Sequence, residues 1–143
     1  MRDIFVRGPI SPAFVAESLA RHSTQTGIGA HSLFLGQVRA DLVEGKKVSA
    51  IDYTAYEPMA LEAMQEIREG IFARYPLSCL HVHHSLGQVR AGEISLFVFA
   101  SSPHRRVAID ACNEVVEAIK ASLPVWGKEV FDTQDSRWKE NQS

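Results

Sequence analysis

The residues from 93 to 128 read EISLFVFASSPHRRVAIDACNEVVEAIKASLPVWGK. The apolar residues from Leu96 to Phe99 are continuous, which predicts a strand covered on both faces. Ser102 is expected to cap the helix after this strand. The buried stripe of this helix is predicted from apolar residues at helical spacing, which are Val107, Ala111, Val115 and Ile119. Pro124 is expected to end the helix, because proline cannot continue a helical hydrogen-bond ladder.

On the N-terminal side of this stretch, strands and helices alternate. Strands are expected where apolar residues run or alternate between turn residues, at 4–6, 27–38, 48–56 and 79–86. Helices are expected to open at Pro12 and at Pro58, and the second of them ends at Pro76. The polar residues 41–47 predict a mobile loop. These elements predict an α+β or α/β fold in which two main helices pack on a mostly antiparallel sheet.

Length and composition predict one globular domain spanning residues 1–143, with 45% hydrophobic and 22% charged residues. The net charge of -2 gives the whole surface no general attraction to nucleic acid or membranes. No apolar run approaches the length of a membrane span, and residues 1–20 lack the apolar core of a signal peptide. Cys79 and Cys112 stand far apart and fit no disulfide framework or zinc knuckle. We therefore expect a reducing, cytoplasmic location.

Two lysines flank the proline that ends the last helix. Lys120 lies at the helix end, Trp126 is expected to anchor the segment after the proline, and Lys128 comes next. Two ammonium groups placed in this way suit an anionic, carboxylate-like group, and a partly buried lysine becomes reactive. The alternative interpretation is a solvated lysine near a helix C-terminus, where positive charge is favourable anyway.

Two further places suit anions. Arg39 ends a strand beside the polar loop, where a guanidinium captures anions, although an exposed surface arginine is the alternative. Residues 101–106, Ser-Ser-Pro-His-Arg-Arg, place hydroxyls, a histidine and two arginines where a helix begins. A helix start offers free N–H groups and the positive end of the helix dipole. The pattern favours a phosphate site over a plain capped helix with solvated arginines.

Two histidines raise the question of a metal site. His81 and His83 fall on one face of a predicted strand, at a spacing that metal sites use. We see no nearby cysteine, aspartate or glutamate that completes a ligand set. Histidines packed at a surface or an interface are therefore the favoured interpretation, and metal binding is the alternative.

The spacing along the last helix limits how these places combine. His104 and Lys120 are sixteen residues apart on one predicted helix, which is about 24 Å at 1.5 Å per residue. They cannot share a small-molecule pocket within one chain. If both serve one site, that site is built across two copies, and an isologous dimer carries two equivalent composite pockets.

From about Gly27 to Trp138 the chain resembles the large, catalytic subunit of molybdopterin synthase. The order and spacing of several motifs carry the resemblance. These motifs are Gly36-Gln-Val-Arg39, Tyr56-Glu-Pro-Met-Ala60, His84-Ser-Leu-Gly87, Ser102-Pro-His-Arg105, Lys120-Ala-Ser-Leu-Pro-Val-Trp126 and Arg137-Trp138.

The resemblance implies a sulfurtransferase of molybdenum cofactor biosynthesis. This family adds two sulfurs to cyclic pyranopterin monophosphate and so forms the dithiolene of molybdopterin. The sulfur arrives as a thiocarboxylate on the C-terminal Gly-Gly of a small ubiquitin-like subunit. The large subunit forms a homodimer, so the assembly is a heterotetramer. An α/β hammerhead fold with a small added β-region is implied, and neither a metal nor an organic cofactor is required.

The same resemblance assigns roles to residues. Lys120 is implied to be the catalytic lysine, with Lys128 as a second candidate. The residues implied to bind the pterin substrate are Phe34, Arg39, Arg137 and, from the other large subunit, His104 and Arg105.

Two positions depart from the family pattern. Many members have a second functional lysine directly after the tryptophan, where this chain has Gly127, so we expect a bulge at Gly127 to turn Lys128 toward the pocket. Ser85 stands where an arginine is common. Two other function classes stay open, namely a weakly active or inactive dimeric module that binds the ubiquitin-like partner, and an unrelated phosphate-ligand or metal-binding domain.

Overall fold

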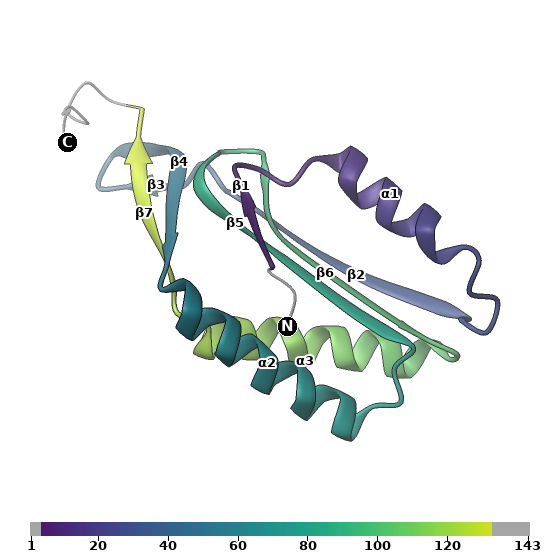
Figure 1. Cartoon of the computed structure of the whole chain (residues 1–143). Helices are drawn as coiled ribbons and strands as arrows, with labels where there is room; N and C mark the ends of the chain where they lie inside the picture. The colour runs from purple at the N-terminus through teal and green to yellow at the C-terminus, as the bar shows by residue number, and fades with distance from the viewer. Residues whose placement is uncertain (1–3, 133–143) are drawn as a thin grey trace.

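A computed structural model describes residues 4–132 as three helices and a seven-stranded sheet (Figure 1). The strands are β1 (Phe5–Arg7), β2 (Ala30–Gln37), β3 (Leu42–Val43), β4 (Lys46–Ala55), β5 (Cys79–Arg90), β6 (Ile94–Ser102) and β7 (Val125–Phe131). The helices are α1 (Pro12–His22), α2 (Glu57–Arg74) and α3 (Arg105–Ser122). The predicted α+β class is confirmed.

The sheet is almost entirely antiparallel. Its main path runs β2-β6-β5-β4-β3, while β7 pairs with β4 and the short β1 pairs in parallel with β5. The central strand β6 is buried along nearly its whole length, as the continuous apolar run predicts. Helices α2 and α3 lie together on one face of the sheet and α1 lies on the other (Figure 1). The two main helices of the prediction, α2 and α3, cover one face of the sheet. The prediction did not include α1 as the cover of the other face.

Each face of the sheet has its own apolar cluster. The larger cluster joins β5 and β6 to α2 and α3 through side chains such as Met64, Leu80, Val98 and Val115. The smaller one lies under α1 and contains Ile10, Val15, Phe97 and Phe99. Successive residues of β6 serve the two faces in turn, because side chains alternate across a strand.

Helix α3 follows the predicted stripe but starts later than predicted. Ala111, Val115 and Ile119 are buried, while Val107 is half-buried. The residue that caps the helix is His104, whereas Ser102 is the last residue of β6. The Ser102 hydroxyl donates to the His104 carbonyl, so it fixes the turn before the helix and caps no helical N–H.

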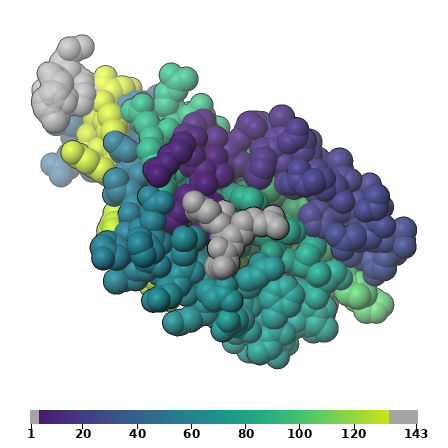
Figure 2. Space-filling model, in the orientation of Figure 1, coloured from purple at the N-terminus to yellow at the C-terminus, as the bar shows by residue number. Residues whose placement is uncertain are grey.

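A small β-region extends one end of the sheet. It consists of β3, β4, β7 and the second half of β5. Strand β5 continues past the predicted end at Leu86, with a φ of 85° at Gly87, and pairs with β4 from Gly87 to Arg90. The predicted loop at 41–47 is instead β3, a tight turn and the start of β4. In Figure 2 the yellow residues of β7 and their blue and green neighbours project beyond α1 and α2. Among residues 4–132, no helix has the length and apolar character to cross a membrane.

Candidate active site

A cavity of about 380 Å³ lies where the last turn of α3 meets the small β-region. It draws residues from several strands or their ends and one residue from a helix, Lys120. The lining residues are Phe34, Leu35, Gly36, Gln37, Val38, Arg39, Asp41, Val48, Ile51, Tyr53, Ser95, Lys120 and Glu129. We call it the Lys120 cavity. It brings together three residues that the sequence singled out, which are Phe34, Arg39 and Lys120.

The end of β2 is shaped by its pairing with β6. The register of this pair shifts between Gly36 and Gln37. A Cβ at Gly36 would lie 3.3 Å from Leu96 Cβ and 3.3 Å from the Phe34 ring, so glycine lets the strand pass close to both side chains. Beyond this point β2 ends, and Arg39 extends into solvent at the rim of the cavity.

The cavity carries charges of both signs. Lys120 is exposed at the C-terminal end of α3, where the helix dipole favours a cation. Arg39 Nε lies 3.3 Å from Asp41 Oδ1, and the two side chains are 83% and 46% exposed. An ion pair this exposed contributes little to stability, so an anionic ligand can replace Asp41 as the partner of Arg39. Glu129 supplies a second carboxylate from β7.

The lining of the Lys120 cavity also includes uncharged polar groups. Tyr53 Oη donates to Ser95 Oγ at 3.3 Å, and Ser95 Oγ donates to the Gly36 carbonyl at 3.5 Å. The Tyr53 ring packs edge-on against His84, with centroids 5.3 Å apart. His84 is buried and donates from Nδ1 to the Ser85 carbonyl at 2.8 Å. Burial, reinforced by the charge of Lys120, lowers the pKa of His84 despite this hydrogen bond, so the imidazole is held neutral.

Sequence reasoning missed Tyr53, Ser95 and Glu129 as cavity residues. Tyr53 and Ile51 lie two residues apart in the strand predicted at 48–56, so strand alternation puts them on the same face, and both line the cavity. Glu129 had no such signal, because the sequence did not predict β7 as a strand.

The expected bulge at Gly127 is absent. Strand β7 pairs with β4 in regular register there, with Tyr53 opposite Gly127 and Asp52 opposite Lys128. The φ of Gly127 lies outside the positive range adopted by Gly87. Gly127 faces the cavity side, because a Cβ added to it would meet Ile51 and Tyr53. Lys128 therefore points to the opposite face and does not line the Lys120 cavity.

A second cavity, also of about 380 Å³, lies at the other end of α3. It is lined by Gly29, Pro103, His104, Arg105 and Arg106, and we call it the His104 pocket. Gly29 passes close to the backbone of Pro103, since a Cβ there would lie 2.2 Å from the Pro103 carbonyl oxygen. His104 and Arg105 thus line a cavity separate from that of Lys120 within one chain. Arg137 and Trp138 lie outside the described residues.

The histidines of β5 are arranged differently from expectation. His83 packs against Phe14 and Phe97. His81 lies next to His22 of α1 and to Cys79, which stands two residues earlier on the same strand face. The prediction that no cysteine lies near enough to complete a ligand set was wrong.

Comparison with known proteins gives a consistent result. Residues 7–122 match the family model described as MoaE protein. The chain is 38% identical over 138 residues to the molybdopterin synthase catalytic subunit of Drosophila melanogaster, covering 95% of this chain and 36% of that protein. It is 42% identical over 116 residues to molybdopterin synthase catalytic subunit 1 of Aedes aegypti, covering 79% and 74%. The chain therefore spans about a third of the Drosophila relative and about three quarters of the Aedes one.

Solved structures share the fold. Molybdopterin synthase from Staphylococcus aureus matches with a TM-score of 0.79 at 29% identity, covering 92% of this chain and 93% of that chain. A complex of subunits 1 and 2 of molybdopterin-converting factor from Helicobacter pylori matches with a TM-score of 0.76 at 19% identity, covering 90% and 84%. Since the family model spans most of the chain and includes both Arg39 and Lys120, the chain belongs to the MoaE protein family.

Proposed function

We propose that this protein is the catalytic subunit of a molybdopterin synthase. In this role it converts cyclic pyranopterin monophosphate to molybdopterin with thiocarboxylate sulfur from a small ubiquitin-like subunit. The observation that carries the proposal is the convergence of Phe34, Arg39 and Lys120 on one cavity at the edge of the small β-region. Membership of the MoaE family and the names of the Drosophila and Aedes relatives support it.

The charges of the Lys120 cavity suit both partners of this reaction. A thiocarboxylate is anionic, and so is the carboxylate left after sulfur transfer, so the Lys120 ammonium stabilises both and the charge that develops between them. Arg39 is the second cation and suits the cyclic phosphate, once the ligand replaces Asp41 as its partner. Phe34 supplies an apolar surface beside the pterin ring.

The complete site is proposed to need two copies of the chain. Within one chain, Lys120 and the pair His104 and Arg105 line separate cavities at opposite ends of α3. An isologous dimer allows the His104 pocket of one copy to close over the Lys120 cavity of the other. His104 and Arg105 of the partner subunit would then add donors for the phosphate and the pterin carbonyl edge.

The sulfur donor is proposed to be a protein that threads its C-terminal Gly-Gly into the Lys120 cavity. The fold of this chain also occurs in the Helicobacter pylori protein complex, which supports a small partner subunit. Two large and two small subunits make the proposed heterotetramer.

The test is a sulfur-transfer assay with a purified, thiocarboxylated small subunit and the cyclic pterin. Wild-type protein should form molybdopterin, and Lys120→Ala should abolish product formation while leaving circular dichroism unchanged, because the exposed Lys120 side chain contributes little packing. Lys47→Ala is the matched control, since Lys47 is an exposed lysine outside the cavity. Product formation near the wild-type rate by Lys120→Ala would refute the assignment.

A second candidate function is a dimeric module that binds the ubiquitin-like partner and has weak or no activity. The observation that favours it is the outward direction of Lys128, which leaves Lys120 as the one lysine of the cavity among residues 4–132. Binding of the small subunit without molybdopterin formation by the wild-type protein would select this alternative.

A further inference from the structure

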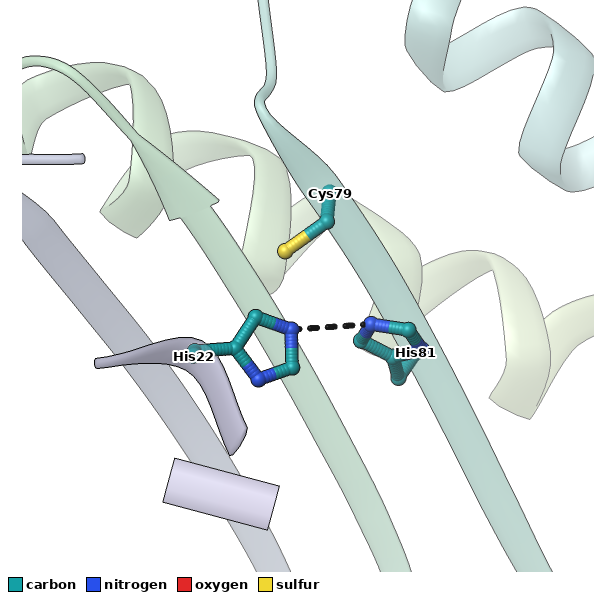
Figure 3. A group of neighbouring side chains, drawn as sticks. All are labelled: His22, Cys79 and His81. Atoms are coloured by element: carbon teal, nitrogen blue, oxygen red, sulfur yellow. Dashed lines mark hydrogen bonds between the residues drawn. The ribbon is translucent and has the colours of Figure 1, made fainter. Parts of the chain in front are cut away.

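A cluster of three metal-ligating side chains lies under α1 and belongs to neither cavity lining. It consists of His22, Cys79 and His81, whose candidate ligand atoms all lie within 4.8 Å of one another. Figure 3 shows the Cys79 sulfur and the two imidazoles directed into one space between β5 and the end of α1. Neither the Lys120 cavity nor the His104 pocket includes any of the three residues.

Hydrogen bonding prepares His22 as a ligand. Its Nδ1 lies 2.6 Å from the Ser18 carbonyl oxygen, which can only accept, so Nδ1 carries the proton. A neutral His22 therefore presents the lone pair of Nε2 toward His81. Metal-binding histidines commonly use the second ring nitrogen in this way, because a carbonyl partner fixes the tautomer and the ring orientation.

The spacing of the donors fits a tetrahedral ion. His22 Nε2 and His81 Nε2 lie 3.1 Å apart. A zinc ion bound to both at 2.0–2.1 Å would hold them about 3.3–3.4 Å apart, so the nitrogens need to separate by only about 0.2–0.3 Å. In the metal-free protein, His81 donates the Nε2 proton of this contact to His22 Nε2. When a metal binds, His81 shifts to the neutral tautomer with the proton on Nδ1, so that its Nε2 lone pair faces the ion.

The surroundings allow three protein ligands and one open position. His22 is buried, with 8% of its surface exposed, and packs against Phe99 with ring centroids 4.7 Å apart. Cys79 and His81 are half-buried, so an ion between them can be reached from solvent. His31 lies further away, with its ring centroid 6.2 Å from that of His22, and it is not among the three residues whose ligand atoms cluster. A water molecule would therefore complete a tetrahedral set.

We propose that His22, Cys79 and His81 bind a divalent transition-metal ion of the zinc type. Two neutral imidazoles and one thiolate form a donor set that such borderline-soft ions prefer over Ca²⁺ or Mg²⁺. Binding breaks the Cys79 S–H bond and releases its proton to solvent, while the sulfur forms the bond to the metal. The ion would join the last residue of α1 to the first strand residues of β5.

The experiment is Zn²⁺ titration of untagged, metal-stripped protein, followed by calorimetry and thermal unfolding. We expect one equivalent per chain. Zinc at about 100 times its Kd should raise Tm by about 5–10 °C. Cys79→Ser and His81→Gln each remove a metal ligand. Loss of a residue that only hydrogen-bonds to a ligand weakens metal affinity by roughly 10–100-fold, so each of these variants should lose more than that.

Matched controls lie on the same strand and in the same chain. His83→Gln changes the next histidine on this face of β5, and Cys112→Ser changes the other cysteine, whose pKa burial raises. Both should bind Zn²⁺ with wild-type affinity and stoichiometry. Equal affinity in the wild-type, Cys79→Ser and His81→Gln proteins would overturn the proposal.

Cobalt substitution tests the thiolate ligand in the wild-type protein itself, and two variants extend the test. Co²⁺ bound to the wild-type protein should show the intense visible bands of four-coordination and a thiolate charge-transfer band in the near ultraviolet. The charge-transfer band should disappear in Cys79→Ser and persist in Cys112→Ser. A wild-type spectrum without thiolate charge transfer would rule out Cys79 as a ligand and the proposed site with it.

Discussion

The two ends of α3 present different kinds of site. At its C-terminal end, the Lys120 cavity is lined by residues of several strands, by charges of both signs and by the hydrogen-bonded pair Tyr53 and Ser95. At its N-terminal end, the His104 pocket is lined by a glycine, a proline, a histidine and two arginines. None of these lining residues carries a carboxylate. The Lys120 cavity has the mixed lining that is typical of a reaction site, whereas the His104 pocket offers mainly hydrogen-bond donors. This difference between the two ends is what the proposed shared dimeric site predicts.

The largest expected effect tests whether the two ends meet across a dimer. Lys120→Ala chains and His104→Ala chains should each be inactive. After subunit exchange in equal amounts, half of the dimers are mixed and each holds one wild-type pocket, so activity should recover to about a quarter of the wild-type value. The sulfur-transfer assay measures this, with exchange followed by native mass spectrometry. Confirmed exchange without recovery would argue against a shared site and for a site within one chain.

The wall of the Lys120 cavity should be sensitive to added volume at Gly127. A Cβ there would lie 2.7 Å from Ile51 Cγ2 and 3.2 Å from Tyr53 Cε1. Gly127→Ala should therefore lower the free energy of unfolding by about 1–2 kcal/mol, as measured by urea denaturation.

Gly27→Ala is the control for this change, because a Cβ at Gly27 has no neighbour within 4 Å. It should leave stability unchanged or raise it by up to about 1 kcal/mol. Equal stabilities of the two variants would show that Ile51 and Tyr53 move aside for the added methyl group at little cost.

The electrostatic difference between the two ends should appear in the pH dependence of stability. Burial lowers the pKa of His84 below its ordinary value of 6.5. The unfolded chain therefore binds more protons than the folded one below that pH, and stability should fall as pH falls from about 7 toward the folded pKa. His84→Gln should flatten this part of the Tm profile.

His104→Gln, which changes the exposed histidine at the other end of α3, should keep the wild-type slope. Thermal unfolding followed by circular dichroism between about pH 5 and 8 makes the comparison. A wild-type slope in His84→Gln would mean that other groups cause the acid sensitivity.

The smallest expected effect concerns Lys128. Because it points away from the Lys120 cavity, Lys128→Ala should change the sulfur-transfer rate by less than about threefold, whereas a lysine that contacts a developing charge supplies far more. A loss approaching that of Lys120→Ala would restore the catalytic role that the sequence suggested for Lys128 and require a rearranged β7 in the assembled complex.

Local patterns accounted for most of the fold. The apolar run of β6, the stripe of α3 and the prolines at Pro12 and Pro58 each act within a few residues, so helix and strand periods report them directly. The boundaries near Ser102 and Leu86 were wrong. A hydroxyl before a helix has several backbone partners to choose from, and a glycine within a strand can either end it or let it bend.

The site shows the same division. Motifs singled out Phe34, Arg39 and Lys120, and the structure places them around one cavity. Strand pairing across the chain decided the rest. The register of β7 on β4 brings Glu129 to the cavity and turns Lys128 away. The packing of α1 on β5 brings His22 to Cys79 and His81. Local sequence carries no record of such contacts, because they depend on which elements become neighbours and in which register.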